Sequence, residues 1–281
     1  MNVIMTITEM HSLADAQRMQ GKKIGFVPTM GFLHEGHLSL MRRARKENDV
    51  VVSSIFVNPT QFGPQEDLER YPRDAEGDRQ KCESAGVDYL FMPAASEMYP
   101  GKPAVLVTIE GISEVLEGAI RPGHFTGIAT VVAKLFNIVH PHTAYFGQKD
   151  YQQGVVIKRM VSGLNLPVEV VVMPTVRESD GLAMSSRNTY LSADERLTAA
   201  SIWRALGAVE HLFRFGIRDP EALKKAVRDL LLKVPDLTID YVEVADTDSL
   251  MPLATIAQAA VMLVAVRLGK TRLIDNILLG G

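Results

Sequence analysis

Short apolar runs alternate with amphipathic segments along the first 175 residues, and this alternation limits the possible fold more than any other feature. The apolar runs cover residues 23–27, 49–57, 87–92, 104–109, 143–147 and 167–173. Their nearly continuous apolar character is typical of strands that are covered on both faces. The segments between them, 36–48, 74–86, 126–139 and 151–163, have helical patterns. We therefore expect an α/β fold with a Rossmann-like, open parallel sheet and right-handed crossovers.

The pattern changes after about Pro174. A long helix is predicted over 192–216, with Ser192 as its N-cap and Glu195 three residues later. A second helix is predicted over 219–234, and three strands are predicted over 237–244, 260–268 and 272–279. The sequence thus predicts a Rossmann-like domain over residues 1–175 and a smaller α+β domain over 176–281.

Composition excludes several classes of protein. The 281 residues carry 30 Lys and Arg against 33 Asp and Glu, a net charge of −3 that argues against a nucleic-acid-binding protein. The single cysteine, Cys82, excludes an intramolecular disulfide and a cysteine-based metal cluster. The first ten residues lack a basic signal-peptide region, and the longest uncharged run, 249–266, is interrupted by Pro252. We expect a cytoplasmic protein without a membrane span.

The segment PTMGFLHEGHLSL, residues 28–40, is the strongest functional signal. A strand ends at Pro28, a glycine turn follows, and a helix opens between His34 and His37. The first turn of a helix offers unpaired N–H groups and the positive end of a dipole, both suited to phosphate. Glycines in the turn allow a ligand to approach the backbone closely. Two histidines three residues apart can then donate to charge that develops on the phosphates.

Two further segments have the chemistry of a phosphate and substrate site. GQKDYQQ, residues 147–153, again follows a predicted strand, so it is expected at the same carboxyl edge of the sheet. Its Lys149 can bring a charge to phosphate, and Gln153 can both donate to and accept from a small polar substrate. LAMSSRNTYL, residues 182–191, combines two hydroxyls with Arg187 and is either a phosphate clamp or a helix-capping loop.

These three segments, in this order, resemble the pantoate–β-alanine ligase family of the HIGH-motif nucleotidyltransferase superfamily. The resemblance extends over the whole chain through residues 56–73, 121–132 and 272–277. It implies condensation of (R)-pantoate with β-alanine to give pantothenate, AMP and diphosphate. ATP is the co-substrate, Mg²⁺ the implied metal, pantoyl adenylate the enzyme-bound intermediate, and a homodimer the implied assembly.

The resemblance also implies roles for individual residues. The catalytic groups would be His37, His34, Lys149 and Arg187, with His37 as the proton donor. ATP would contact Met30, Gly31, Phe32, Leu33, His34, Glu35, Gly36, His37, Gly147, Gln148, Lys149, Asp150, Val176, Met184, Ser185, Ser186 and Arg187. Gln61 and Gln153 would bind pantoate, Gln61 also β-alanine, and Asn58 would lie near them. The acidic stretch 74–78 departs from that of some relatives, so no metal ligand is assigned. The loop 61–73 and the smaller domain would act as a lid that keeps water from the adenylate.

Other functions remain open at this stage. Another nucleotidyltransferase of the same superfamily would share the paired histidines but would not need the polar residues of 58–61 and 147–153. A tRNA synthetase is disfavoured by the short chain and the acidic balance. A nucleotide-sensing protein without turnover would not need all four charged or imidazole groups. His124 is either a pocket residue or a structural one.

Overall fold

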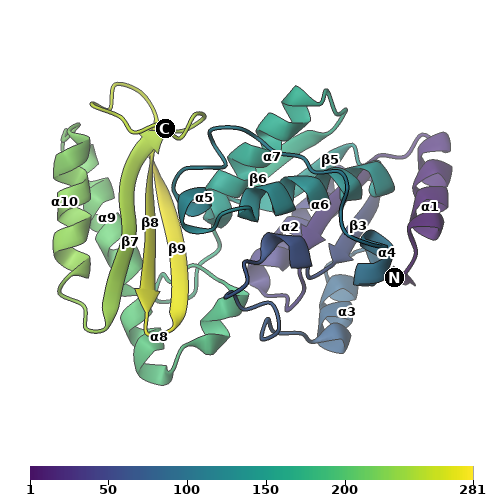
Figure 1. The fold of residues 1–281 in the computed structure, drawn as a ribbon, viewed down its shortest axis with the longest axis horizontal. Helices are drawn as coiled ribbons and strands as arrows, with labels where there is room; N and C mark the ends of the chain where they lie inside the picture. The colour runs from purple at the N-terminus through teal and green to yellow at the C-terminus, as the bar shows by residue number, and fades with distance from the viewer. Residues whose placement is uncertain (281) are drawn as a thin grey trace. The chain divides into compact units, whose positions relative to one another are not determined.

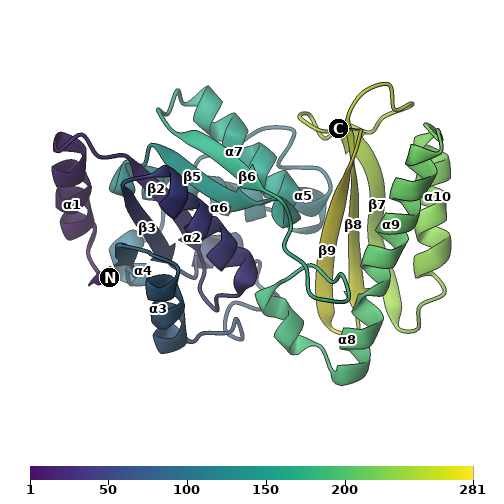
Figure 2. The ribbon, with the colours of Figure 1, turned by 180° about the vertical axis from the view of Figure 1, so that it is seen from behind.

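The computed structural model describes residues 1–280, which form two compact units (Figures 1 and 2). Unit 1 contains Met1–Gln148 and Gln152–Pro174, and unit 2 contains Lys149–Tyr151 and the residues from Thr175 onward. The short stretch Lys149–Tyr151 therefore groups with residues that begin at Thr175, 24 positions after Tyr151. Among the described residues, no helix is long and apolar enough to cross a membrane.

Unit 1 is built on a six-stranded parallel sheet, which confirms the predicted α/β class. Its strands are β1 (Asn2–Ile4), β2 (Ile24–Thr29), β3 (Val50–Ile55), β4 (Tyr89–Phe91), β5 (Thr143–Gly147) and β6 (Glu169–Met173), in the order β1-β4-β3-β2-β5-β6. From β2 the chain proceeds outward through β3 and β4, whereas β5 and β6 lie on the other side of β2. The strand order thus reverses between β2 and β5, where open α/β sheets bind their ligands.

Helices cover both faces of this sheet (Figure 1). The longer ones are α1 (Ile7–Met19), α2 (Glu35–Glu47), α3 (Ala75–Ser84), α6 (His124–Val139) and α7 (Tyr151–Gly163), and the short ones are η1 (Pro59–Gln61), α4 (Ala95–Met98), α5 (Glu117–Ile120) and η2 (Gln148–Asp150). On one face, Met41 of α2 and Cys82 of α3 share a buried cluster with Val27 of β2. On the other, the ring of Phe136 in α6 meets Phe26 edge-on at 6.4 Å. Because adjacent strand residues face opposite ways, Phe26 and Val27 serve two different cores.

One local prediction in unit 1 was wrong, and one strand was missed. Residues 104–109 form no strand but an extended segment, in which Val105 is 77% exposed and the Val107 N–H donates to Thr130 Oγ1 at 2.9 Å. A β-branched run alone cannot form a strand without a neighbour to pair with. The strand β1 was missed, and α1, a helix with a weak amphipathic pattern, has only Met10 and Ala14 fully buried.

Unit 2 combines a three-stranded antiparallel sheet with helices, as expected for an α+β arrangement. The elements are η3 (Ser186–Tyr190), α8 (Ala193–Ala199), α9 (Ser201–Arg214), α10 (Pro220–Leu231), β7 (Leu237–Asp246), β8 (Ala260–Leu268) and β9 (Thr271–Leu279), with sheet order β7-β8-β9. Leu206 of α9 and Leu223 of α10 are fully buried in one cluster with Val242, Met262 and Val264 of the sheet.

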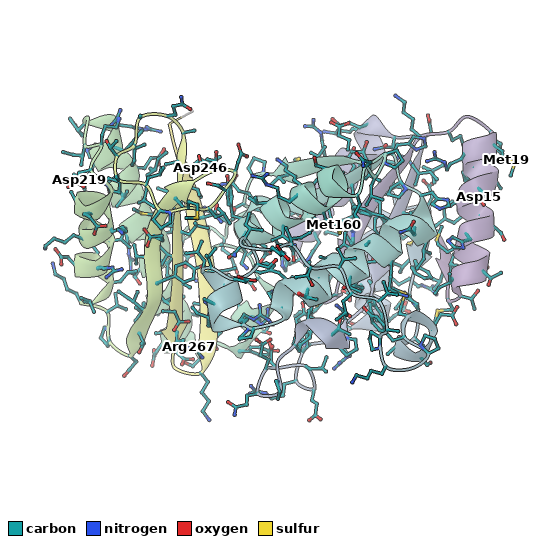
Figure 3. All side chains as sticks on the ribbon, turned by 45° about the horizontal axis from the view of Figure 1, so that its top comes forward. Asp15, Met19, Met160, Asp219, Asp246 and Arg267 are labelled. Carbon is teal, nitrogen blue, oxygen red and sulfur yellow. The ribbon has the colours of Figure 1, made fainter. Side chains whose placement is uncertain are left out.

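The ends of these helices follow the capping chemistry of the sequence. Ser192 accepts from the Glu195 N–H and Glu195 bonds back to the Ser192 N–H, so the predicted capping box is confirmed. Asp219, labelled in Figure 3 at the start of α10, accepts from the Glu221 N–H. The single helix predicted over 192–216 is divided at Ala200 into α8 and α9, although Ala200 keeps right-handed helical backbone angles.

Gly127 of α6 offers a test of packing near the carboxyl edge. A Cβ there would lie 2.4 Å from Thr60 O and 2.7 Å from Gln61 Cα, both backbone atoms that cannot rotate away. We expect Gly127→Ala to lower the free energy of unfolding by about 1–3 kcal/mol through overpacking. Gly207 of α9 has open space at its Cβ position, so Gly207→Ala should raise it by about 0.5–1 kcal/mol. Urea unfolding measures the free energy of unfolding of both variants. Equal changes in Gly127→Ala and Gly207→Ala would contradict the packing explanation.

Candidate active site

The turn after β2 has an unusual backbone that is fixed by side chains. Thr29 Oγ1 accepts from the Gly31 N–H at 3.2 Å and donates to Ser54 O at 2.7 Å. Gly31 and Phe32 then both have positive φ angles, of 84° and 49°. Two successive left-handed residues cost conformational energy, particularly at Phe32, so the surrounding structure must hold this turn.

That hold comes from Asp78 in α3, a residue to which the sequence patterns assigned no role. Its carboxylate accepts from the Phe32 N–H at 2.6 Å and from the Leu33 N–H at 2.7 Å, while Lys81 Nζ donates to Leu33 O at 2.9 Å. Asp78 is 1% exposed. Burial raises its pKa, and the hydrogen bonds from Leu33 and Phe32 act in the opposite direction. The available sequence signal was an acidic residue four positions before Cys82, on the inner face of a short helix.

His34 and His37 form a capping box at the start of α2. The Gly36 N–H donates to His34 Nδ1 at 3.2 Å, the His34 N–H donates to His37 Nδ1 at 3.3 Å, and the ring centroids are 4.1 Å apart. Because a backbone N–H can only donate, both Nδ1 atoms are acceptors, and in the neutral rings the proton is on Nε2. The cap therefore selects one tautomer for each histidine, with Nε2–H as the donor.

Two adjacent glutamines after β5 have different surroundings. Gln152 is 3% exposed, and its amide donates to Ile112 O and Val115 O at 2.8 Å and accepts from the Glu117 N–H at 3.1 Å. Gln153 is partly exposed, and its side chain makes no hydrogen bond within the described residues. Gln152 thus fastens the 112–117 turn to α7, whereas the neighbouring Gln153 is more exposed.

Gln61 lies beside the turn that follows β2. Its Nε2 contacts Met30 Sδ at 3.2 Å, and its Oε1 accepts from Asn58 Nδ2 at 3.1 Å. Asn58 is 1% exposed, and its amide also donates to Gly127 O and accepts from Thr60 and Tyr99. The structure therefore brings Gln61 together with Met30, and it uses Asn58 as a support for Gln61.

His124 supports the same glutamine from α6. Arg121 Nη1 donates to His124 Nε2 at 2.8 Å, so the ring proton is on Nδ1 and is donated to Gln61 O, also at 2.8 Å. Arg121 in turn forms a bidentate pair with Glu66, at 2.7 and 2.6 Å. Both ring nitrogens of His124 are thus bonded to protein atoms, and the ring links α6 to the segment 61–66.

Most of the remaining predicted residues lie in unit 2 or in η2, which joins β5 to α7, whereas Gly147 ends β5 and Glu35 begins α2. Lys149 Nζ lies 3.6 Å from Asp150 Oδ1, and Lys149 O accepts from Asn276 Nδ2 at 3.0 Å. Ser185 caps η3 by accepting from the Arg187 N–H at 3.3 Å. The segment therefore contains the helix cap that the sequence allowed, and Arg187 lies in the helix that Ser185 caps.

Among residues 1–280, no three His, Cys, Asp or Glu side chains are grouped so that they could hold a metal ion. The carboxylate of Asp78 is occupied by backbone N–H groups, and that of Asp150 faces an ammonium. Protein sites for Mg²⁺ usually supply only one or two carboxylates and rely on substrate phosphates for the rest.

A comparison with protein families decides the relationship. The family model described as pantoate-beta-alanine ligase matches residues 2–278. The chain belongs to the pantoate-beta-alanine ligase family. The curated relatives in this family are enzymes named pantothenate synthetase. The resemblance that the motifs indicated is therefore confirmed.

Individual members of the ligase family match over their full length. The pantothenate synthetases of Moorella thermoacetica and Thermotoga neapolitana are both 54% identical, with 99% and 100% of each chain covered. The crystal structure of the pantothenate synthetase from Thermus thermophilus is 48% identical, with a TM-score of 0.95 over all of both chains. A pantoate-beta-alanine ligase from Francisella tularensis, 36% identical with a TM-score of 0.80 over 99% and 97% of the chains, is described as complexed with beta-gamma ATP and beta-alanine.

The environment of His124 predicts a pH dependence of stability. Burial and the nearby charge of Arg121 lower its pKa to about 4, although Gln61 O, Glu66 and Glu117 act against this. Above pH 6.5 the ring is neutral in the folded and unfolded states. As the pH falls from 6.5 towards 4 the unfolded chain binds the proton more readily, so stability decreases by up to about 1.4 kcal/mol per pH unit.

His124→Asn should remove this contribution while keeping a donor near the position of Nδ1. Urea unfolding between pH 4 and 7.5 measures it: the advantage of the wild type over the variant should decrease as the pH falls. His211→Asn, on the exposed face of α9, is the control and should leave the wild-type profile unchanged. A difference between wild type and His124→Asn that stays constant with pH would contradict a lowered pKa.

Proposed function

We propose that this chain condenses (R)-pantoate with β-alanine in an ATP-dependent reaction that gives pantothenate, AMP and diphosphate through an enzyme-bound pantoyl adenylate. The observation that carries this proposal is the match to the ligase family over residues 2–278. Relatives that match over their whole length are named for this activity, and one is complexed with beta-gamma ATP and beta-alanine.

The first step joins two anions. A carboxylate oxygen of pantoate attacks the α-phosphorus of ATP, the bond to the β-phosphate oxygen breaks, and diphosphate leaves. Charge gathers on the departing oxygens, and donors fixed in advance stabilise it most effectively. His34 and His37 suit this task because their capping box holds each Nε2–H at a helix start. We assign Lys149 and Arg187 of unit 2 to the phosphates as positive charges.

ATP contacts are proposed for the backbone of the turn after β2 and for the segments around Lys149 and Arg187. The left-handed turn held by Asp78 supports the first, since its backbone can approach a phosphate chain. In unit 2, Val176 and Met184 lie side by side, because the Met184 N–H donates to Val176 O at 3.0 Å.

Pantoate is assigned to Gln61 and Gln153. A glutamine amide can donate to and accept from hydroxyl and carboxylate groups without adding charge. Gln61 is held by Asn58 and His124, so its orientation is set before the substrate binds. We also assign β-alanine to the Gln61 side of this segment.

In the second step the amine of β-alanine attacks the carbonyl of the adenylate. A C–N bond forms, the bond between the carbonyl carbon and the phosphate oxygen breaks, AMP leaves and the amine loses a proton. No covalent bond to the enzyme is needed. Magnesium enters this scheme as part of the MgATP substrate, where it neutralises phosphate charge. We propose that the loop 61–73 and the smaller domain, residues 176–281, exclude water from the adenylate.

We further propose a homodimer in the cytoplasm, where ATP is available. The extended segment Ala104–Thr108 supports association, since Val105 and Leu106 are 77% and 59% exposed. Exposed apolar groups of this kind are a common feature of surfaces that a second protein chain covers.

Mass spectrometry of products from ATP, pantoate and β-alanine tests the function directly. Pantothenate and AMP should form in equal amounts, and pantoate alone should support exchange of labelled diphosphate into ATP. Exchange that depends on another acceptor would favour a different nucleotidyltransferase, and ATP binding without any turnover would favour a nucleotide sensor.

The paired histidines allow the cap and the catalytic donor to be separated. His37→Asn keeps an acceptor near the position of Nδ1, which receives the His34 N–H, but it removes Nε2. We expect adenylate formation to fall by about 10²–10³-fold with little change in melting temperature. His37→Ala should lose as much rate and also about 1 kcal/mol of stability. Near-normal single-turnover adenylation by a folded His37→Asn enzyme would contradict the assignment.

Gln152 and Gln153 form a matched pair for a second prediction. Gln153→Ala should raise the KM for pantoate by at least tenfold, or about 1.4 kcal/mol, and should narrow the preference for pantoate over a deoxy analogue. Gln152→Ala should instead lower the free energy of unfolding by about 2–4 kcal/mol, because three buried backbone groups lose their partner. Steady-state kinetics and urea unfolding measure both variants. A stability loss in Gln153→Ala together with a raised KM for pantoate in Gln152→Ala would contradict these roles.

A further inference from the structure

Two adjacent polar residues, Asp275 and Asn276, are buried in β9, where they are 4% and 1% exposed. Their neighbours in the strand, Ile274 and Ile277, are apolar. A buried carboxylate and a buried amide destabilise a fold unless their hydrogen bonds are made, and apolar residues would serve the core equally well. The partners of these two side chains therefore indicate what the pair does.

Asp275 holds the segment that contains Val176 and Met184. Arg177 donates to its two carboxylate oxygens at 2.5 and 2.9 Å, a bidentate pair with side chains only 16% and 3% exposed. Residues 176–184 form a narrow loop, in which Arg177 pairs with Ala183 and the Met184 N–H donates to Val176 O. The ion pair thus fixes the position of both ends of this loop.

The same arginine is held on a second side. Its guanidinium lies 3.7 Å above the ring of Trp203 and donates to Gly181 O at 3.1 Å. Gly181 has a φ of 92°, and a Cβ there would lie 1.9 Å from Trp203 Cδ1, so only glycine fits this turn. Arg177 therefore has one defined position, and so does the loop that leads to Arg187.

Asn276 holds the other phosphate segment. Its Nδ2 donates to Lys149 O at 3.0 Å, which ties η2 to a strand 127 residues later. The Asn276 N–H also donates to Asp275 Oδ1 at 2.8 Å, so the two side chains are coupled to each other. This contact explains why Lys149–Tyr151 groups with unit 2.

We propose that Asp275 and Asn276 are positioning residues for ATP: together they fix the backbone that carries Lys149 and the loop that carries Val176, Met184 and Arg187. The inference rests on the proposed function, since those residues are assigned to ATP there. Neither Asp275 nor Asn276 contacts the nucleotide in this proposal. Both act by reducing the freedom of cationic segments that must meet phosphate, and a displacement of about 1 Å in such groups can reduce a rate by about 10²-fold.

The two half-reactions separate positioning from stability. Asp275→Asn and Asn276→Asp keep the side-chain shape. The first replaces one of the two oxygens that accept from Arg177 with a donor, and the second removes the donor to Lys149 O. Each should raise the KM for ATP or lower pantoate-dependent diphosphate exchange by about 10- to 100-fold. Consumption of preformed pantoyl adenylate with β-alanine, which needs no diphosphate contacts, should change by less than about threefold on the same reasoning. Arg177→Lys, which keeps the charge but loses the bidentate geometry, should show the same split if the other variants fold poorly.

Asp240→Asn is the matched control. Asp240 of β7 is a carboxylate of the same sheet that bonds Arg267 and Arg272 at 3.1 and 2.7 Å, neither of them in an ATP segment. It should lower the melting temperature without separating the half-reactions. A parallel fall of both half-reactions in Asp275→Asn and Asn276→Asp, or the same split in Asp240→Asn, would overturn the proposal. Failure of the proposed function is a different result, because the wild-type enzyme would then form no pantoyl adenylate.

Discussion

The two hydrogen bonds from the Phe32 and Leu33 N–H groups to the buried carboxylate of Asp78 are the interaction on which the turn after β2 and the start of α2 depend. They hold a turn with two successive left-handed residues, which would otherwise relax towards ordinary backbone angles. Hydrogen bonds to a charged group contribute about 1.5–3 kcal/mol each, enough to offset this strain. Since α2 starts directly after the turn, the direction of its first N–H groups and of its two histidines follows from Asp78.

A common principle links the support of each candidate group. His34 and His37 hold each other through their Nδ1 atoms, and Gln61 is held by Asn58 and His124. In each case a polar side chain uses its own hydrogen bonds to hold the backbone or amide of a neighbour. Such support lowers the entropy that substrate binding would otherwise have to remove. It also explains why so many buried polar groups surround the carboxyl edge of the sheet.

Unit 2 uses the same device on a different scaffold. A single edge strand, β9, holds Lys149 through Asn276 and the 176–187 loop through Asp275 and Arg177. The antiparallel sheet and its helices α9 and α10 bury an independent core, so this strand is rigidly placed. The charged residues that we propose for phosphate binding are thereby carried by short segments whose position depends on a sheet rather than on their own local structure.

The sequence by itself determined the class of fold, most of the strands, the capped ends of α8 and α10, and the segments expected to carry the chemistry. The hydrophobic periodicity, apolar content and capping residues of a segment are local properties, so they can be recognised in the sequence without knowing what the segment packs against. Only the tertiary structure decided that residues 104–109 form no strand, that Gln152 and Gln153 have different surroundings, and which backbone and side-chain groups Asp78, His124 and Asp275 hold. Each of these depends on a contact between residues 35 to 98 positions apart, or on the absence of one. No local pattern encodes such a contact, because the burial of a polar group and the identity of its partner exist only once the chain has folded.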